Sequence, residues 1–581
     1  MSAKSQGPIR RHKLTEVAKT TDRKEILSPL GACIAAAVLV AAVFAVYSPS
    51  LNFDFVLDDH RFVGDPRLQS WGHVWEYFTS YVWSQFTGGP LSFYRPVFVV
   101  WMRLNFILTG ASPWGWHLLS IAKHAAVAML LGLLVWKLLK DRVAALMAAA
   151  LFAIHPAQAE SVAWVTVPDP LMSAGVLGSL LLYLGYASRR SDDRTASEER
   201  LRQKSKKEKR APSKTHSRAW WIAASTAAFL AALMAKETAV VVPAVVFVMA
   251  LNLPLDEMGI RTKQRRIGVQ VASAFRATLP FLGATLIYFL LRLNAVGQIS
   301  PQTQHLPWKT LLLSWPATLW FYVKVMLWPV HERAFADPSV VELFSVRGVV
   351  VPGLVVFCAG VLLVSACRWA MRTARRNLPA HELADIQRAL LLSSSLLVLP
   401  ILLALNLNSL NPGDFLHGRY TYLALGGLAL LLATGWRLAT KLRLVLMVTG
   451  GLLAAVFAVL TVQQERMWKD DLTVFTVAHE YAPHNDPVNL NLMRAHVQVA
   501  LFLDEDDRCN EAMPIFDQAT REYPQDYYAW AGRGECLVKL NDLPRAEQSL
   551  QRAFELSHDS HIAEQLRQVR DMRGLPTAPS N

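Results

Sequence analysis

Charged residues are scarce in this chain. Only 18% of its 581 residues are Asp, Glu, Lys or Arg, whereas soluble proteins average about 25%. The deficit is concentrated between residues 30 and 462, where long apolar runs recur. These runs are too many and too long to be the core helices of a soluble protein, so a bilayer is needed to cover them. The scarcity of charge therefore predicts an all-α, polytopic membrane bundle.

Nucleotide-binding loops and metal-binding cysteine patterns are absent from the sequence. No Walker pattern is present, and no glycine-rich turn separates a strand from a helix. The five cysteines have no metal-ligand spacing. Cys33, Cys358 and Cys367 fall in or beside apolar runs, where a thiol packs as a small apolar residue. The absences exclude chemistry that uses a bound cytosolic nucleotide.

The net charge of +14 does not indicate a nucleic-acid partner, because no recognition fold accompanies it. The basic residues gather in four segments, as they do in the cytoplasmic loops of membrane proteins. The four groups are Arg10, Arg11, Lys13, Lys19, Arg23 and Lys24; the stretch 189–218; Arg261, Lys263, Arg265 and Arg266; and Arg368, Arg372, Arg375 and Arg376.

Placing every basic loop in the cytoplasm gives a consistent topology. Residues 1–29 are a cytoplasmic N-terminus, and 30–47 form an anchoring span, because Tyr47-Ser48-Pro49 is not a small-residue cleavage site. A first outer loop follows at 48–115. Eleven spans are expected within 30–462: 30–47, 116–139, 143–154, 171–186, 219–234, 238–251, 278–291, 349–366, 389–405, 420–433 and 444–462.

Three apolar stretches need special treatment. Residues 96–108 are interrupted by Arg103 and Asn105, so we expect an amphipathic helix at the membrane interface. Residues 143–154 are short of the ~20 residues that cross a bilayer and should form a tucked helix. A span at 311–328 would place the last basic group outside, so a re-entrant or interfacial segment is preferred there.

The C-terminal part contains an internal repeat. Ala512, Phe516 and Ala519 recur 34 positions later as Ala546, Leu550 and Ala553. This period is typical of tetratricopeptide repeats, in which small residues let paired helices approach. The expected order is a connector at 463–486, a repeat α-solenoid at 487–572 and a tail at 573–581. The topology predicts a multi-pass inner-membrane protein with a cytoplasmic N-terminus and a periplasmic repeat domain.

Cys509 and Cys536 would lie on adjacent helices of this array. An oxidising compartment would allow a disulfide between them. Two buried free thiols are the alternative, because sequence does not reveal whether the geometry fits.

The candidate catalytic residues begin with Asp58 and Asp59, just outside the first span. Adjacent carboxylates beside a membrane raise each other's pKa through repulsion and partial desolvation. Such a pair suits a general base that takes a proton from an acceptor hydroxyl. It could also coordinate a divalent cation, Mg²⁺ or Mn²⁺. The alternative is a solvated acidic turn.

A second outer segment runs from His155 to Glu160 and continues to Trp164 and Asp169. Its carboxylates lie at the same membrane level as Asp58. An interfacial belt, with the Trp164 ring at the headgroups, is the alternative.

Four cations, Arg95, Lys236, Arg292 and Arg419, lie at the outer ends of spans. A lipid-phosphate donor needs positive charge at this depth, and Arg binds phosphate bidentately. Snorkelling side chains are the alternative interpretation, expected of about two of the four.

Several motifs together resemble a known family. They are Phe53 to His60, Arg95-Pro96, His155-Pro156, Glu160-Ser161-Val162-Ala163-Trp164, Lys236-Glu237-Thr238, Arg419-Tyr420-Thr421-Tyr422-Leu423 and Trp468-Lys469-Asp470-Asp471. In this order, and followed by the repeats, they resemble bacterial relatives of the transmembrane-and-tetratricopeptide-repeat O-mannosyltransferases, within the GT-C superfamily of glycosyltransferases.

The resemblance implies a transferase that uses a polyprenyl-phosphate sugar at the outer face. It implies that Asp58 is the base, that Asp59 positions the acceptor or a cation, and that Glu160 is the second-loop glutamate. Arg292 and Arg419 would bind the donor phosphate, and the repeats would present a protein acceptor. The family's Arg after Trp164 is absent here, and Asp169 would take the acidic position in a shifted register.

Two other functions remain open. One is sugar transfer to a glycolipid or cell-wall polymer, with the repeats docking a partner enzyme. The other is a non-catalytic membrane scaffold whose repeats recruit partner proteins. A transporter is disfavoured because the spans contain few charges and no evident inverted repeat.

Overall fold

The computed structural model describes residues 27–85, 93–203, 215–251, 263–298, 305–330, 340–410, 416–505 and 507–575. The basic residues predicted for the cytoplasmic N-terminus, Arg10 to Lys24, lie outside these ranges, as does Arg261. The segment 189–218 is described in part and without its side chains.

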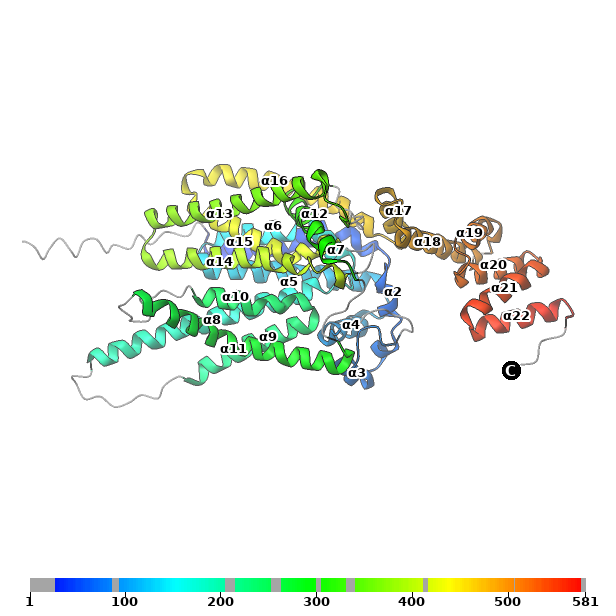
Figure 1. Ribbon diagram of the computed structural model, residues 1–581, viewed down its shortest axis with the longest axis horizontal. Helices are drawn as coiled ribbons and strands as arrows, with labels where there is room; N and C mark the ends of the chain where they lie inside the picture. Colours follow the sequence, from blue (N-terminus) through cyan, green and yellow to red (C-terminus); the bar gives the residue numbers. More distant parts are fainter. Residues whose placement is uncertain are drawn as a thin grey trace, which may run out of the picture.

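The described chain is helical throughout (Figure 1). The long helices of the bundle are α1 (Pro29–Val46), α5 (Pro113–Leu139), α6 (Arg142–Ala153), α8 (Asp169–Gln203), α9 (Thr215–Ala235), α10 (Val242–Leu251), α11 (Lys263–Val296), α12 (Trp308–Leu327), α13 (Val351–Asn377), α14 (Ala380–Leu403), α15 (Tyr422–Leu438) and α16 (Arg443–Glu465). Short helices α2 (Asp58–Val63), α3 (Val74–Thr79), α4 (Pro96–Thr109) and α7 (Ala159–Ala163) lie between them. The remaining helices are α17 (Asp471–Tyr481), α18 (Asp486–Glu505), α19 (Cys509–Glu522), α20 (Tyr527–Lys539), α21 (Leu543–Ser557) and α22 (Ser560–Met572).

Nine helices of the described chain are long and apolar enough to cross a membrane. A tenth span results if α6 and the segment Pro156–Ala163, bent by 60°, are taken together. This break occurs where 143–154 was predicted to form a short, tucked helix. Helices α9 and α10 fall among the shorter apolar helices. The predicted all-α polytopic bundle is confirmed, and the chain is a multi-pass membrane protein.

Helix α4 turns its polar residues inward. The side chains of Arg103 and Asn105 are buried, whereas Leu104, Ile107 and Leu108 are exposed. The guanidinium of Arg103 lies 5.0 Å from the centre of the Trp71 ring. An amphipathic helix was predicted here; in the structure α4 buries Phe98, Val99 and Met102 as well as its two polar residues. Its position at a membrane interface remains a prediction.

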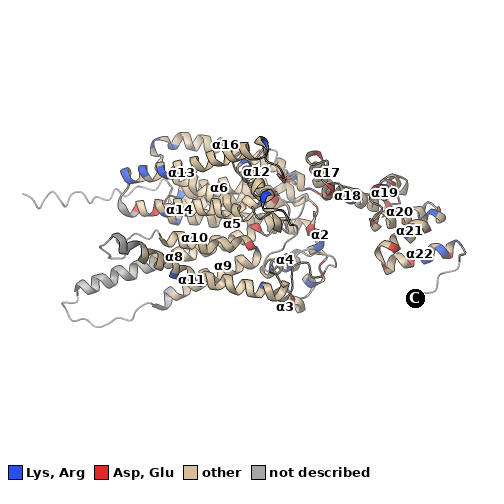
Figure 2. Ribbon diagram, in the orientation of Figure 1, with Lys and Arg blue, Asp and Glu red and all other residues tan. Residues whose placement is uncertain are grey.

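The two ends of the bundle differ in charge and in covering. The basic residues of the C-terminal turns of α13 lie at the end away from the repeat helices (Figure 2). The short helices α2, α3 and α4 lie at the opposite end, the end from which the repeat helices project (Figure 1). Residues 308–327, where a re-entrant segment was preferred, form the continuous helix α12. Its length and composition also fit a span.

Helices α17 to α22 continue from the end of the last long helix as a row of antiparallel pairs (Figure 1). The six residues that define the 34-residue period are all buried in the cores of these helices. Gly534 permits the close approach, because a Cβ atom there would lie 2.6 Å from Cγ of Leu550. The predicted packing of the repeat is therefore present.

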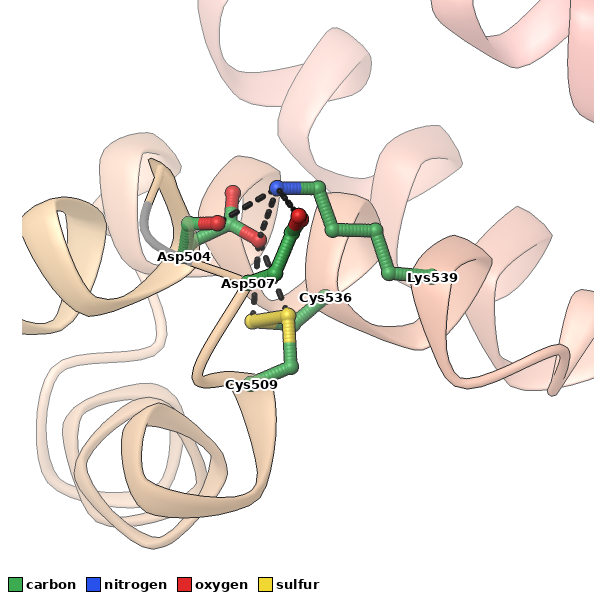
Figure 3. Close-up of a disulfide and its surroundings, with 5 residues drawn as sticks. All are labelled: Asp504, Asp507, Cys509, Cys536 and Lys539. Carbon is green, nitrogen blue, oxygen red and sulfur yellow. Dashed lines mark hydrogen bonds and ion pairs between the residues drawn. A yellow bond between two sulfur atoms is a disulfide. The ribbon is translucent and has the colours of Figure 1, made fainter.

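Cys509 and Cys536 join α19 to α20 through a disulfide, with their Cα atoms 5.2 Å apart (Figure 3). The buried carboxylate of Asp504 lies against both sulfur atoms, and the ammonium of Lys539 contacts the carboxylates of Asp504 and Asp507. Of the two alternatives left open by the sequence, the structure adopts the bonded pair.

Candidate active site

A cavity of about 410 Å³ opens at the end of the bundle that carries the short helices. Five of the predicted site residues line it: Asp58, Arg95, Lys236, Arg292 and Arg419. Much of the remaining wall is apolar, from residues that include Phe62, Phe98, Val240, Phe289, Leu403 and Leu410. The cavity combines two carboxylates, Asp58 and Glu237, with four cations and an apolar wall, which suits an amphipathic ligand with an anionic head.

Asp58 opens α2, directly after a residue with unusual backbone geometry. Leu57 has φ 55° and ψ −121°, a region that residues other than glycine rarely adopt. This turn directly precedes α2, whose first residue, the half-buried Asp58, lines the cavity. The structure therefore places the predicted base in the cavity that the four cations also line.

Asp59 lies in a different environment from its neighbour. Its side chain is fully buried. One carboxylate oxygen accepts from the backbone N–H and the hydroxyl of Thr166, at 3.1 and 2.6 Å, and the other accepts from the N–H of Val56 at 3.2 Å. Burial raises the pKa of Asp59 to about 7, although these hydrogen bonds act in the opposite direction. Asp59 anchors the first outer loop to the second and does not line the cavity.

Arg95 and Arg292 share one carboxylate. Glu237 accepts from Arg95 at 3.0 and 2.8 Å through one oxygen and from Arg292 at 3.1 Å through the other. These residues come from the start of α4, the turn after α9 and the last turns of α11. Glu237 therefore holds both guanidinium groups at the cavity wall.

Lys236 pairs with Asp169. Its ammonium lies 2.6 Å from each oxygen of the Asp169 carboxylate, and both side chains are buried. The ammonium also lies 4.8 Å from the centre of the Tyr420 ring. Asp169 begins α8, and Lys236 directly follows the end of α9, so the ion pair ties two neighbouring helices together at the cavity. Asp169 is thus the counter-ion of a predicted phosphate-binding residue.

Glu160 holds Arg419 and a histidine that sequence analysis did not single out. One Glu160 oxygen lies 2.8 Å from Nδ1 of His417 and 3.6 Å from Nε of Arg419. Its other oxygen accepts from the backbone N–H of Arg419 at 3.0 Å. The guanidinium stacks 4.3 Å from the centre of the Trp164 ring. Buried Glu160 is not part of the cavity wall and acts by orienting Arg419.

The ring of His155 makes two hydrogen-bond contacts, both with the backbone. Nδ1 accepts from the N–H of Ala157 at 3.2 Å, and Nε2 lies 3.1 Å from the carbonyl oxygen of Met326. The ring is buried and does not line the cavity. The sequence grouped it with the acidic residues because it is close to Glu160 along the chain, but its ring points elsewhere.

The acidic pair is a poor fit to a divalent cation. Asp59 is fully buried and does not line the cavity, so Asp58 alone of the pair could offer an oxygen there. Asp504, Cys509 and Cys536 also approach one another in the repeats, but the two cysteines form a disulfide and are not available as metal ligands. We therefore derive the chemistry of the cavity without a metal.

Three residues beside the cavity were not predicted as site residues: Glu237, Thr166 and His417. Glu237 follows a predicted cation, and His417 lies two residues before another, so adjacency was a usable signal. Thr166 gives no such signal. Its contact with Asp59 joins segments 107 positions apart, which only the tertiary structure brings together.

Comparison with known protein families finds a tetratricopeptide repeat match over residues 505–568. The match falls within the segment 487–572 that the 34-residue period predicted. It covers helices α19 to α21 and most of α22.

Curated relatives match the membrane bundle as well. Protein O-mannosyl-transferase TMTC3 of Homo sapiens is 25% identical over 558 residues, which cover 89% of this chain and 54% of that protein. Protein O-mannosyl-transferase TMTC1 of Homo sapiens is 34% identical over 167 residues, or 28% of this chain and 18% of that protein. This chain spans about half the length of TMTC3.

Among solved structures, the crystal structure of the Archaeoglobus fulgidus oligosaccharyltransferase in the apo form aligns with a TM-score of 0.37 and 11% identity. The alignment covers 80% of this chain and 60% of that one. The resemblance inferred from the motifs is confirmed by the sequence relatives: across most of its length, this chain is similar to the transmembrane protein O-mannosyltransferases.

Proposed function

We propose that this protein is a membrane glycosyltransferase that moves a sugar from a polyprenyl-phosphate donor to a Ser or Thr hydroxyl of an exported protein. The observation that carries the proposal is the cavity shared by Asp58 and four cations. The similarity to protein O-mannosyltransferases supports the same reaction class. The absence of a nucleotide-binding motif from the sequence favours a lipid-linked donor.

Asp58 acts as the general base. It takes the proton of the acceptor hydroxyl while the hydroxyl oxygen forms a bond to the anomeric carbon of the donor sugar. The bond between that carbon and the phosphate oxygen breaks, and its electron pair leaves with the phosphate. A base placed in this way contributes about 10²–10⁴-fold to the rate. The step balances without a metal or a redox partner.

The cations stabilise the departing phosphate. Charge develops on the phosphate as its bond to the sugar breaks, and fixed positive groups lower the energy of that state. Arg95, Arg292 and Arg419 are held in place by Glu237 and Glu160, so they need little reorganisation. Glu237 and Glu160 neutralise part of the positive charge of these arginines. The charge that remains can bind the donor phosphate without binding the product phosphate too tightly for release.

The apolar wall accommodates the first isoprene units of the donor. Val240, Phe289 and Leu403 come from the helical bundle rather than from the outer loop. A lipid chain can therefore extend from the cavity toward the bilayer while its phosphate contacts the cations. The repeats, at the same end of the molecule, would bind the protein acceptor (Figure 1).

Charge distribution favours one orientation in the membrane. The basic turns of α13 would face the cytoplasm, and the cavity and repeats would face the periplasm of a bacterial inner membrane (Figure 2). A site on that face agrees with a donor that carries its sugar across the bilayer on a lipid.

The test measures transfer in membranes that contain the full chain, supplied with polyprenyl-phosphate mannose and a secreted acceptor protein. Mass spectrometry of the acceptor detects the added hexose. We expect Asp58→Asn to lower the transfer rate by about 10²–10⁴-fold, because the amide cannot accept the hydroxyl proton. Undiminished transfer by this variant would rule out Asp58 as the base.

Asp54→Asn is the matched control. Asp54 lies in the same outer loop, is exposed, and its side chain accepts from the neighbouring N–H of Phe55 at 2.8 Å, a contact that an amide oxygen can keep. We expect this variant to transfer normally.

If the hexose appears in the lipid fraction instead of on the protein, the acceptor is a glycolipid and the protein-acceptor part of the proposal is wrong.

A further inference from the structure

We propose that Asp471, which follows the last span, is a positioning residue that holds Asp58 in its catalytic orientation. This inference rests on the proposed function. Asp471 does not line the cavity. Its two carboxylate oxygens contact the outer loop on either side of the acidic pair.

One oxygen of Asp471 accepts from the backbone N–H of Leu57 at 2.8 Å, and the other lies 3.2 Å from Nε2 of His60. Leu57 directly precedes Asp58, and His60 directly follows Asp59. The contact with Leu57 joins positions 414 residues apart. The carboxylate of Asp471 therefore contacts the residue before Asp58 and the residue after Asp59. Asp471 itself belongs to a segment that follows the last helix of the bundle.

The contact with Leu57 stabilises an unusual backbone conformation. Leu57 adopts φ 55° and ψ −121°, a conformation that persists in a non-glycine residue only where the surroundings enforce it. The hydrogen bond to Asp471 fixes the amide at this turn. Since the turn sets the direction of the first residue of α2, loss of the bond would let Asp58 move away from the cations.

Neighbouring contacts show that the whole segment is docked against the outer loop. The N–H of Asp54 donates to the carbonyl oxygen of Lys469 at 2.9 Å. The buried Trp468 ring stacks on Trp164, with ring centres 5.6 Å apart. Val56 packs in the same apolar cluster as Val474 and Phe475 of α17. The loop position is therefore defined by α17, which leads directly into the repeats.

The test compares Asp471→Ala with Asp470→Asn in the same mannose-transfer assay. Alanine removes both oxygens that contact the outer loop, whereas an Asn oxygen could still accept from the N–H of Leu57. Asp470 caps α17 by accepting from the N–H of Thr473, which Asn can also do, and among the described residues its carboxylate makes no hydrogen bond or ion pair with the outer loop. We expect Asp471→Ala to lower kcat by about 10²-fold, since a shift of about 1 Å in a reacting group has this effect. The KM for donor and acceptor should remain unchanged, and Asp470→Asn should match wild type.

A second-site change distinguishes positioning from general stability. Glycine adopts the Leu57 conformation without steric cost. We therefore expect Leu57→Gly to restore part of the kcat lost in Asp471→Ala. Asp471→Glu, which keeps the charge but displaces it by one methylene, should have an intermediate kcat and serves as a second variant if the Ala protein is poorly folded.

Hydrogen exchange gives a readout that does not depend on activity. Amide exchange in the peptide spanning 53–60 should be faster in Asp471→Ala than in Asp470→Asn. Equal kcat in these two variants, or a change confined to KM, would overturn the positioning role. If Asp58→Asn transfers normally, the proposed base is wrong, and the exchange comparison still decides whether Asp471 holds the loop.

Discussion

Adjacent residues Asp58 and Asp59 have different surroundings and different tasks. They begin the same short helix, yet one lines the cavity and the other is fully buried under Thr166. The separation follows from helical geometry, since consecutive side chains on a helix point about 100° apart. A doublet that looks symmetric in the sequence therefore supplies one cavity-lining carboxylate, the proposed base, and one anchor.

The ion pair between Lys236 and Asp169 gives a prediction at this scale. Asp169→Asn leaves a buried ammonium without its carboxylate, and breaking a buried pair in this way costs about 3–5 kcal/mol. We expect a correspondingly lower unfolding temperature in detergent, measured by the fluorescence of the protein during heating.

The double variant Asp169→Asn with Lys236→Met removes both charges and serves as the control. It should recover most of the lost stability, because no uncompensated buried charge remains. It should still transfer sugar poorly, with a raised KM for the lipid donor, if Lys236 contacts the phosphate. If the single and double variants unfold at the same temperature, the unpaired charge of Lys236 is not the cause of the lost stability.

The close packing of α14 against α15 depends on a glycine, Gly427, which has no side chain. A Cβ atom on Gly427 would lie 2.5 Å from the backbone nitrogen of Leu397 and 2.7 Å from the backbone oxygen of Ser393. Both atoms belong to the backbone of α14, so neither can move aside as a side chain could. This close approach brings α15, with Arg419 and Tyr420 just before it, against the helix that carries Leu403 at the cavity.

We therefore expect Gly427→Ala to destabilise the bundle by about 1–3 kcal/mol or more, the usual cost of overpacking. Thermal unfolding in detergent, monitored by size-exclusion chromatography, would measure the loss. Gly435→Ala is the matched control on the same helix, because a Cβ there meets nothing within 4 Å. Equal stability of the two variants would mean that the helices separate easily at this contact.

The whole molecule is polarised along its long axis. The repeats and the short helices lie at one end, and the basic turns of α13 lie at the other (Figure 2). In the topology proposed from the positive-inside rule, the repeats lie outside the cytoplasm. The disulfide between Cys509 and Cys536 agrees with an oxidising compartment on that side.

Protease treatment of intact spheroplasts tests this orientation. A tag placed after Asn581 should be removed by external protease, whereas a tag before Met1 should be protected until the membrane is opened. The two tags on one chain control for lysis. Protection of the C-terminal tag in intact spheroplasts would contradict the proposed topology and, with it, an active site on the outer face.

The sequence by itself determined the features that depend on local pattern. Apolar runs long enough to cross a bilayer require helices, and the 34-residue period required paired helices with small residues at their contacts. Motif order indicated the family, and the outer cations were found because basic residues are sparse on that side. These signals need no knowledge of distant contacts.

Only the tertiary structure decided which residues of the site contact one another. The contacts of Asp59 with Thr166, of Arg292 with Glu237, and of Asp471 with Leu57 join positions that are 107, 55 and 414 residues apart. Hydrogen bonds and ion pairs act over a few ångströms in space, without regard to separation along the chain. Sequence could name several of the charged residues, but only the packing of the helices chose their partners.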